Sequence, residues 1–169
     1  KYLEIEQEIN PWSSGWEQRY YSVCFDMDGI QAVDKHTISD CYWKTILWNA
    51  AYYMNECESW DWYYPYSYPP LLGDFCAFLK TLKRSEGCVK FPDSAPIEPQ
   101  TLLLMVLPPK SFGLMAMGIQ QRMQDPGNLM ALYFPREYEL NIAFHTRYHE
   151  CTPKIPRINI RIVHQFIKH

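Results

Sequence analysis

The 169-residue sequence lacks the positive charge expected of a protein that holds RNA or DNA unaided. Its formal net charge is −3, whereas a self-sufficient nucleic-acid-binding module usually presents a basic stripe. Lys80, Lys83 and Arg84 form the one basic cluster of the sequence, and such a cluster is most often a solvated helix face. Any affinity for nucleic acid would therefore need help from another domain.

Long hydrophobic runs and targeting signals are also missing. The longest purely apolar run, Leu102 to Leu107, is far shorter than the roughly 20 residues that cross a membrane, so no membrane partner is expected. No signal peptide is visible, and the chain begins with Lys1. We therefore expect a fragment of a longer intracellular protein, located in the cytoplasm or the nucleus.

Several chemical signatures are absent as well. The sequence has no P-loop, no Gly-x-Gly-x-x-Gly and no Gly-x-Ser-x-Gly. Its six cysteines are scattered and include no Cys-x-x-Cys pair. A chain of this length and apolar content does not need disulfides, so we expect reduced, mostly buried thiols.

The sequence is instead rich in apolar and aromatic residues. It is 47% hydrophobic and only 21% charged, with 13 Tyr, 6 Trp and 13 Pro, which predicts a sizeable core with stiff connections. The fold class that we expect is mainly α: an irregular helical domain with aromatic and proline-rich connections and at most one or two short strands. Residues 1–36 would form an irregular lead-in with one short helix from Trp16, and residues 37–169 would form the helical domain.

Apolar periodicity places the first helices of that domain. Thr37 and Asp40 have the spacing of a capping box. They precede an apolar face formed by Trp43, Ile46, Leu47, Ala50, Ala51 and Met54. A second helix is predicted over residues 72–82, with Asp74 in its first turn. Its apolar face would consist of Phe75, Phe78, Leu79 and Leu82.

Proline and capping residues place the later elements. Pro99 suits the first turn of a helix that Pro108 stops, and Ser111 can cap a fourth helix. Met115, Met117 and Met123 are expected to fill the core. A short strand is predicted over residues 140–145, and the end of the chain is predicted to be helical.

Two motifs suggest chemistry, and for both we favour a structural interpretation. Asp26 and Asp28 in "FDMDG" are spaced like the nucleophile and the acid/base of haloacid-dehalogenase phosphatases, but the other motifs and the parallel-strand runs of that fold are missing. A turn is the better interpretation. His145, His149 and Cys151 could contribute to a zinc site, but no fourth ligand stands out.

The aromatic block over residues 57–70 has two interpretations. Its six aromatic residues and three prolines cannot form a regular helix. The rings could hold helices together, or one or two of them could line a channel and stack on bases, which contributes roughly 1–3 kcal/mol per base.

The same block carries a family resemblance. "SWDWYYPYSYPPLLGDF" (59–75) resembles Ser-Trp-x-Trp-Tyr-Tyr-Pro-Tyr-His-Tyr-Ala-Pro of the Xrn family of 5′→3′ exoribonucleases. Matches continue in order on both sides, over about residues 11–165. They are "GWEQRYY" (15–21), "YWKTILWNAAYYMNECES" (42–59), "PIEPQTLLLMVLPPKS" (96–111), "YFP" (133–135) and "IPRINIRIV" (155–163).

The resemblance implies the helical middle domain of such an enzyme. The parent would degrade 5′-monophosphorylated single-stranded RNA in the course of RNA decay. Its N-terminal nuclease domain would supply the catalytic carboxylates and bind Mg²⁺, so no catalytic residue, metal ligand or cofactor is expected in this chain, which alone should be inactive. The alternative that we keep is a non-catalytic scaffold or interaction module derived from this domain.

The resemblance also assigns roles to residues. Trp60 and Trp62 are the candidates for the wall of the RNA channel. The structural motif comprises Gly15, Trp16, Arg19, Tyr20, Tyr21, Tyr63, Tyr64, Pro65, Tyr66, Asp74, Pro108 and Pro156. Residues that depart from the family pattern, such as Glu17, Ser67 and Pro69, indicate a divergent member of the family. A large DNA virus or a protist is a candidate source.

Overall fold

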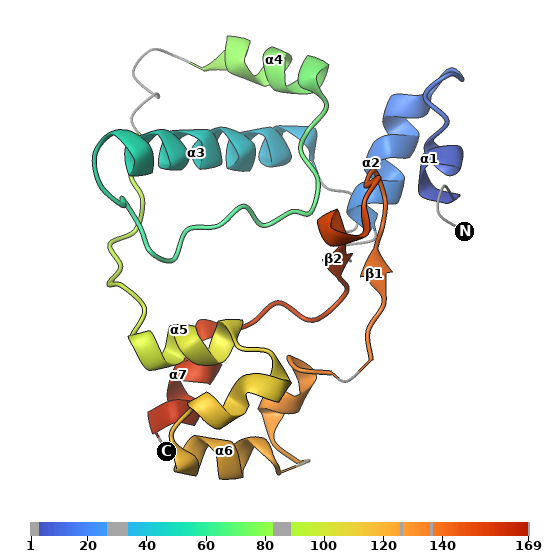
Figure 1. The fold of residues 1–169 in the computed structure, drawn as a ribbon. Helices are drawn as coiled ribbons and strands as arrows, with labels where there is room; N and C mark the ends of the chain where they lie inside the picture. Colours follow the sequence, from blue (N-terminus) through green and yellow to red (C-terminus); the bar gives the residue numbers. More distant parts are fainter. Residues whose placement is uncertain (1–3, 27–33, 83–88, 126, 136, 169) are drawn as a thin grey trace. The chain divides into compact units, whose positions relative to one another are not determined.

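The computed structural model describes residues 4–26, 34–82, 89–125, 127–135 and 137–168 (Figure 1). They form two compact units, Lys1–Ala95 (unit 1) and Pro96–His169 (unit 2). The organisation expected from the sequence, a lead-in over residues 1–36 and a helical domain over residues 37–169 within one domain overall, stays a prediction. Helices dominate both units, and the described residues contain one two-stranded sheet. This confirms the predicted mainly helical class.

Unit 1 begins with two helices where the sequence predicted an irregular lead-in. The helix predicted from Trp16 is α2, Trp16–Asp26, and a further helix that was not predicted, α1, spans Glu4–Ile9. These two helices pack against each other. The turn between them includes Gly15, whose φ of +80° lies in the left-handed region that favours glycine.

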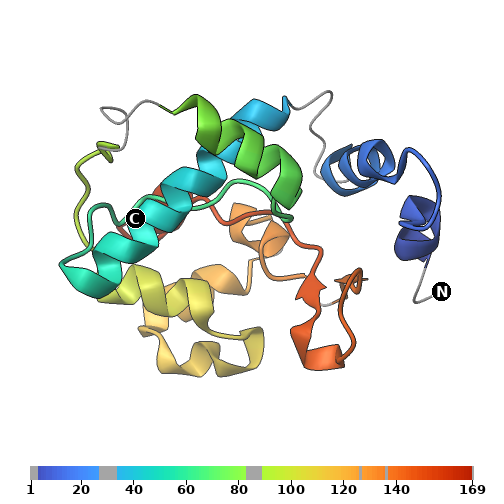
Figure 2. The same cartoon turned by 90° about the horizontal axis from the view of Figure 1, so that it is seen from above.

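Two longer helices complete unit 1. Helix α3 spans Lys35–Met54, and α4 spans Leu72–Thr81, close to the predicted range. They pack together. Figure 1 shows α4 above α3, and Figure 2, seen from above, shows the two helices crossing. Phe75 and Phe78 are the buried residues of α4, which fits the predicted apolar face of that helix.

The start and the buried face of α3 both differ from the prediction. The N-cap is Asp34, whose side chain accepts a hydrogen bond from the His36 backbone N–H at 3.0 Å. Asp40 does not complete a capping box and instead pairs with Lys44 one turn later, at 2.5 Å. The buried residues of α3 are Ile38 and Ser39, so the predicted apolar face from Trp43 to Met54 is not a buried stripe.

Unit 2 consists of short elements. Pro99 occupies the first turn of its first helix, which ends before Pro108 as predicted. The predicted fourth helix is broken: Ser111 lies in a 3₁₀ helix, and the α-helix begins only at Met117. The elements are α5 (Pro99–Val106), η2 (Pro109–Leu114), α6 (Met117–Met123), η3 (Leu129–Leu132), β1 (Leu140–Asn141), η4 (Tyr148–Glu150), β2 (Thr152–Pro153) and α7 (Ile160–Lys168).

The predicted strand over residues 140–145 is shorter than expected. Only β1 forms, and it pairs antiparallel with β2, so that Leu140 faces Pro153 and Asn141 faces Thr152. The chain ends in α7, which confirms the predicted C-terminal helix. No helix within the described ranges is long and apolar enough to cross a membrane.

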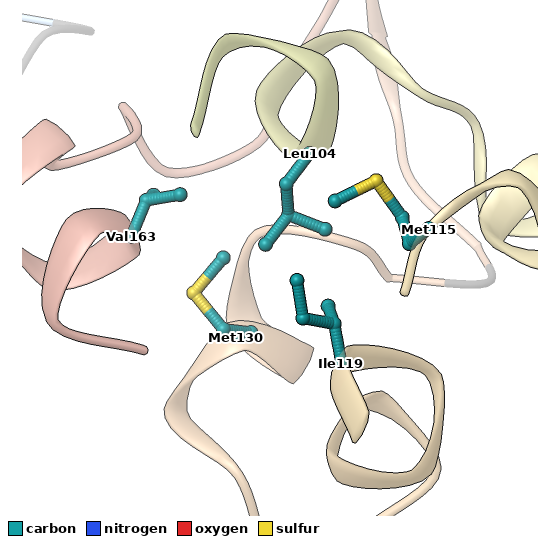
Figure 3. Packing of buried hydrophobic residues seen from close by; sticks show 5 residues of the cluster. All are labelled: Leu104, Met115, Ile119, Met130 and Val163. Carbon is teal, nitrogen blue, oxygen red and sulfur yellow. The ribbon is translucent and has the colours of Figure 1, made fainter. Parts of the chain in front are cut away.

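The core of unit 2 joins its helices. Figure 3 shows five buried side chains that point toward one another from several elements: Leu104, Met115, Ile119, Met130 and Val163. Arg122 of α6 donates hydrogen bonds to the Phe166 and Ile167 carbonyl oxygens and so caps the last turn of α7. The predicted core role is confirmed for Met115 but is wrong for Met117, which is 74% exposed.

Candidate nucleic-acid interface

The aromatic block is an irregular segment that side chains of the helices hold in place. Residues 55–71 form no helix or strand, as its prolines predicted. Tyr20 of α2 donates a hydrogen bond to the Pro69 carbonyl at 2.8 Å, and the Trp48 indole of α3 donates one to the Ser59 carbonyl at 2.8 Å. Both ends of the segment are thereby tied to helices through its backbone carbonyl groups.

A second anchor lies where the segment enters α4. The Tyr21 hydroxyl donates to Asp74 Oδ2 at 2.9 Å and accepts from the Leu71 backbone N–H at 3.0 Å. Lys35 lies 3.1 Å from the Asp74 carboxylate and 4.6 Å above the centre of the Tyr21 ring. Burial, together with the hydrogen bond to Asp74, raises the pKa of the Tyr21 phenol above its usual range, so that it stays a neutral donor.

The rings of the block continue this arrangement. Tyr66 packs edge-on against Phe25 of α2 and against Tyr64, with ring centroids 5.6 and 5.4 Å apart. Tyr64 meets Tyr42 of α3 at 5.6 Å, and Tyr42 in turn meets Phe75 of α4 at 5.2 Å. Edge-to-face pairs of this kind stabilise beyond the area that they bury. The rings of the block therefore contact α2 and α3, and Tyr42 of α3 extends this set of ring contacts to α4.

The guanidinium group of Arg19 organises the motif over residues 15–21, which resembles the Xrn family. Arg19 donates hydrogen bonds to the Ile9 and Ser14 carbonyl oxygens, both at 2.9 Å, and to the Asn10 carbonyl at 3.1 Å. It also contacts Ser13 through the carbonyl and the hydroxyl. Arg19 thus holds the turn that contains Gly15, while Trp16 starts the helix that carries Tyr20 and Tyr21.

Removal of the Tyr21 hydroxyl tests this anchor. In a Tyr21→Phe variant, Asp74 loses a donor and the Leu71 N–H loses its acceptor. We expect the free energy of unfolding to fall by about 1–3 kcal/mol, because the groups left behind are partly buried. Urea unfolding followed by tryptophan fluorescence measures the loss.

Tyr53→Phe serves as the control, because this tyrosine is 83% exposed and should change stability by less than about 0.5 kcal/mol. Since the folded state raises the Tyr21 pKa, its contribution is present below about pH 10 and is lost as the pH rises further. The Tyr21→Phe variant should therefore lose less stability at alkaline pH. Equal stabilities of the two variants would contradict the anchor.

The two channel candidates differ in exposure. Trp60 is 45% exposed, and its backbone N–H donates to Ser94 Oγ at 2.6 Å. Trp62 is half-buried and packs edge-on against Phe91, with centroids 5.4 Å apart. Of the two rings, Trp60 offers more surface for a base to stack on. Ser94 lies in a loop without periodicity, so its role as an anchor was not predicted.

The phosphatase hypothesis is contradicted by the local backbone. Residues 22–25 lie inside helix α2, not in a strand, and Asp26 is the last residue of that helix. The nucleophile of such an enzyme follows a strand, so the required geometry is missing. Asp28 and Gly29, with the turn predicted there, lie outside the described residues, as do Lys83 and Arg84.

The described residues also do not support a zinc site. His145 is exposed and His149 lies in η4, and the described part of the chain contains no group of three or more His, Cys, Asp and Glu that could hold a metal ion. No disulfide joins the described cysteines, which are Cys24, Cys41, Cys57, Cys76 and Cys151. Only Cys24 among them is buried, which corrects the expectation of mostly buried cysteines, and Cys88 lies outside the described ranges.

Segments of unit 2 that resemble the Xrn family also come together. Pro108, the Tyr133–Pro135 segment, Ile155 and Ile158 line one apolar groove of about 360 Å³. Pro156, between the last two, is exposed. Segments far apart in the sequence therefore meet in space in unit 2, as Tyr21 and Asp74 do in unit 1.

Comparison with known proteins agrees with these observations. The family described as the Xrn1 helical domain matches residues 1–165. The "5'-3' exoribonuclease 2" of Gallus gallus is 30% identical over 142 residues, which are 81% of this chain and 14% of that protein. Proteins of the same name are similar in Candida albicans (31% over 137 residues, 80% of this chain and 14% of that protein) and Saccharomyces cerevisiae (28% over 142 residues, 83% and 13%). The chain thus spans about 14% of the length of the curated relatives that it matches.

Proposed function

This chain belongs to the Xrn1 helical domain family, and we propose that it is the helical domain of an enzyme that degrades 5′-monophosphorylated single-stranded RNA in the 5′→3′ direction. The match over residues 1–165 carries the proposal. Relatives named 5'-3' exoribonuclease 2 support it further. The scaffold alternative is not favoured, because these relatives are named as exoribonucleases.

The proposed role of this domain is to support the nuclease domain of the same polypeptide and to form part of the wall of the RNA channel. Hydrolysis would occur in that nuclease domain, where carboxylates would hold Mg²⁺ for metal-assisted attack of water. The described residues of this chain present no cluster of carboxylates for a metal. Their own contribution would be to position and guide the RNA.

Trp60 is the residue that we propose to contact RNA. Its ring is accessible, and its backbone is fixed by Ser94, so a base could stack on it without reordering the segment. Stacking tolerates any base, which suits an enzyme that moves along RNA of varied sequence. The exposed carboxylates of Glu58 and Asp61 lie beside Trp60 in the sequence. The phosphates would therefore need cations from elsewhere in the polypeptide.

Replacing Trp60 with alanine in the parent polypeptide tests the role. Loss of one stacked base would weaken RNA binding roughly 5- to 150-fold, corresponding to about 1–3 kcal/mol. We expect shorter degradation runs on 5′-monophosphorylated RNA with Mg²⁺. Run length is measured by product sizes under single-encounter conditions with trap RNA.

Trp12→Ala is the matched control, because Trp12 is 96% exposed and lies outside the aromatic block. This control should degrade RNA like the wild type. Unchanged run length in a stably folded Trp60→Ala variant would reject the contact, and absence of 5′→3′ degradation by the wild-type parent would reject the function itself.

A further inference from the structure

The segment that ends α3 and continues into the aromatic block carries negative charge without any positive charge. Residues 45–79 contain no Lys, Arg or His, but they contain Glu56, Glu58, Asp61 and Asp74. Lys35 neutralises Asp74. The other three residues are exposed, and none of their carboxylates forms an ion pair with a residue that the structure describes.

Large apolar side chains are exposed at the same end of α3. Tyr52 is 49% exposed, Tyr53 is 83% exposed and Met54 is 82% exposed. Tyr52 stacks on Trp48 with ring centroids 5.3 Å apart and planes 6° from parallel, and Tyr53 packs edge-on against Tyr52 at 5.5 Å. The rings therefore form a pre-arranged surface.

The loop that carries the carboxylates is tied to the helix that carries the rings. The hydrogen bond from the Trp48 indole to the Ser59 carbonyl, at 2.8 Å, ties the loop after α3 back to the helix that carries Tyr52. Glu56 and Glu58 lie within that loop, and Asp61 follows it directly. We call this set the acidic-aromatic surface: Tyr52, Tyr53, Met54, Glu56, Glu58 and Asp61.

We propose that the acidic-aromatic surface docks a basic segment, rich in Arg and Lys, that belongs to the same polypeptide but lies outside these 169 residues. Guanidinium and ammonium groups bind over tyrosine rings and pair with carboxylates, so one cationic segment fits both halves of the surface. RNA itself does not fit, because its phosphates carry the same sign of charge as the three carboxylates.

The length of the relatives supports an occupant in the same polypeptide. The matched region is 14% of the relatives' length, so most of such a chain lies outside the part described here. A tethered segment reaches this surface at an effective concentration that can approach the millimolar range. The inference rests on the proposed function only in treating the chain as one domain of a longer polypeptide.

Docking would also change the surroundings of Trp60. Glu58 and Asp61 flank this residue in the sequence, and an RNA strand that stacks on Trp60 must bring phosphates near them. A basic segment on the acidic-aromatic surface neutralises these carboxylates and supplies the cations that residues 45–79 lack. The same contact would thus join the domains and permit RNA to approach.

Carbodiimide cross-linking of the parent polypeptide identifies the occupant. The reagent joins a carboxylate to a lysine amine in contact with it, and residues 45–79 contain no lysine. We expect Glu56, Glu58 or Asp61 to be joined to lysines outside residues 1–169, with a yield that does not depend on protein concentration. Cross-links only to lysines of this domain, only to a different protein or only between copies would overturn the proposal.

Amide hydrogen exchange supplies the second measurement. It would also detect the docking of a segment that contains arginine but no lysine, which carbodiimide cannot cross-link. In the parent polypeptide, Glu56→Gln/Glu58→Gln/Asp61→Asn should raise the exchange rate over residues 50–61 on the order of tenfold, and high salt should do the same to the wild type. Glu4→Gln/Glu8→Gln/Glu17→Gln removes three exposed carboxylates elsewhere in unit 1 and should change nothing over residues 50–61. Equal effects of the two triple variants would contradict docking.

The outcomes separate this inference from the proposed function. Cross-links from this surface in a parent polypeptide that does not degrade RNA would retain the docking and reject the exoribonuclease. Full degradation activity, together with absent cross-links and unchanged exchange, would retain the exoribonuclease and reject the docking. Ultraviolet cross-linking of RNA to Tyr53 would also overturn the docking, because it would show that RNA occupies the surface.

Discussion

Replacing Phe25 with alanine is expected to lower the free energy of unfolding of unit 1 by about 3–5 kcal/mol. Phe25 is 2% exposed, and its ring lies 6.2, 5.5 and 5.6 Å from the rings of Tyr20, Tyr21 and Tyr66. The substitution therefore removes a buried ring and leaves a cavity between α2 and the aromatic block.

Tryptophan fluorescence during urea unfolding measures this loss selectively. All six tryptophans of the chain lie in unit 1: Trp12, Trp16, Trp43, Trp48, Trp60 and Trp62. Tyr53→Ala is the control, since Tyr53 is 83% exposed and should cost less than about 0.5 kcal/mol in this chain. A Phe25→Ala loss no greater than that of the control would show that the block is not packed on α2.

Leu104→Ala is expected to cost about 3–4 kcal/mol in unit 2. Leu104 is fully buried in the cluster with Met115, Ile119, Met130 and Val163 (Figure 3). Its loss removes contacts among α5, α6 and α7 at once. Because the core is close-packed, the neighbouring side chains can fill only part of the space.

Unit 2 has no tryptophan, so amide exchange followed by mass spectrometry is the suitable measurement. Peptides from α5, α6 and α7 should exchange roughly 100-fold faster or more in Leu104→Ala, as a 3 kcal/mol loss implies. Leu102→Ala changes the same residue type in the same helix, but Leu102 is 46% exposed. Similar exchange in the two variants would contradict the core.

Local signals allowed most of the helices to be predicted. Pro99 and Pro108 bracket α5, and the spacing of Phe75 and Phe78 identifies α4, because proline geometry and apolar periodicity act within a few residues. The cap of α3 was misplaced because Asp34 and Thr37 both suit an N-cap. Composition near a helix start does not decide between such neighbours.

Long-range contacts explain what could not be predicted. The apolar face from Trp43 to Met54 has the periodicity of a core helix, yet its last residue is 82% exposed. Periodicity reports only that a face is apolar and does not identify what covers it. The anchors of the aromatic block have the same origin, since Tyr21 meets Asp74 and Trp60 meets Ser94 across long stretches of sequence.

The candidate site followed from a resemblance, and the structure adds detail to it. The motif residues Arg19, Tyr20, Tyr21, Tyr64 and Tyr66 all engage in contacts that shape unit 1. Trp60 is more exposed than Trp62, the other channel candidate. The assignment of RNA contact to Trp60 stays a prediction, and its test lies in the parent polypeptide.

The most direct test of the central claim is a degradation assay that compares the parent polypeptide with this chain alone. The substrate is 3′-labelled single-stranded RNA carrying either a 5′-monophosphate or a 5′-hydroxyl, in the presence of Mg²⁺. We predict that the parent degrades the monophosphorylated RNA from its 5′ end and that the 169-residue chain degrades neither substrate. Degradation by the isolated chain, or a parent that degrades neither RNA, would contradict the account.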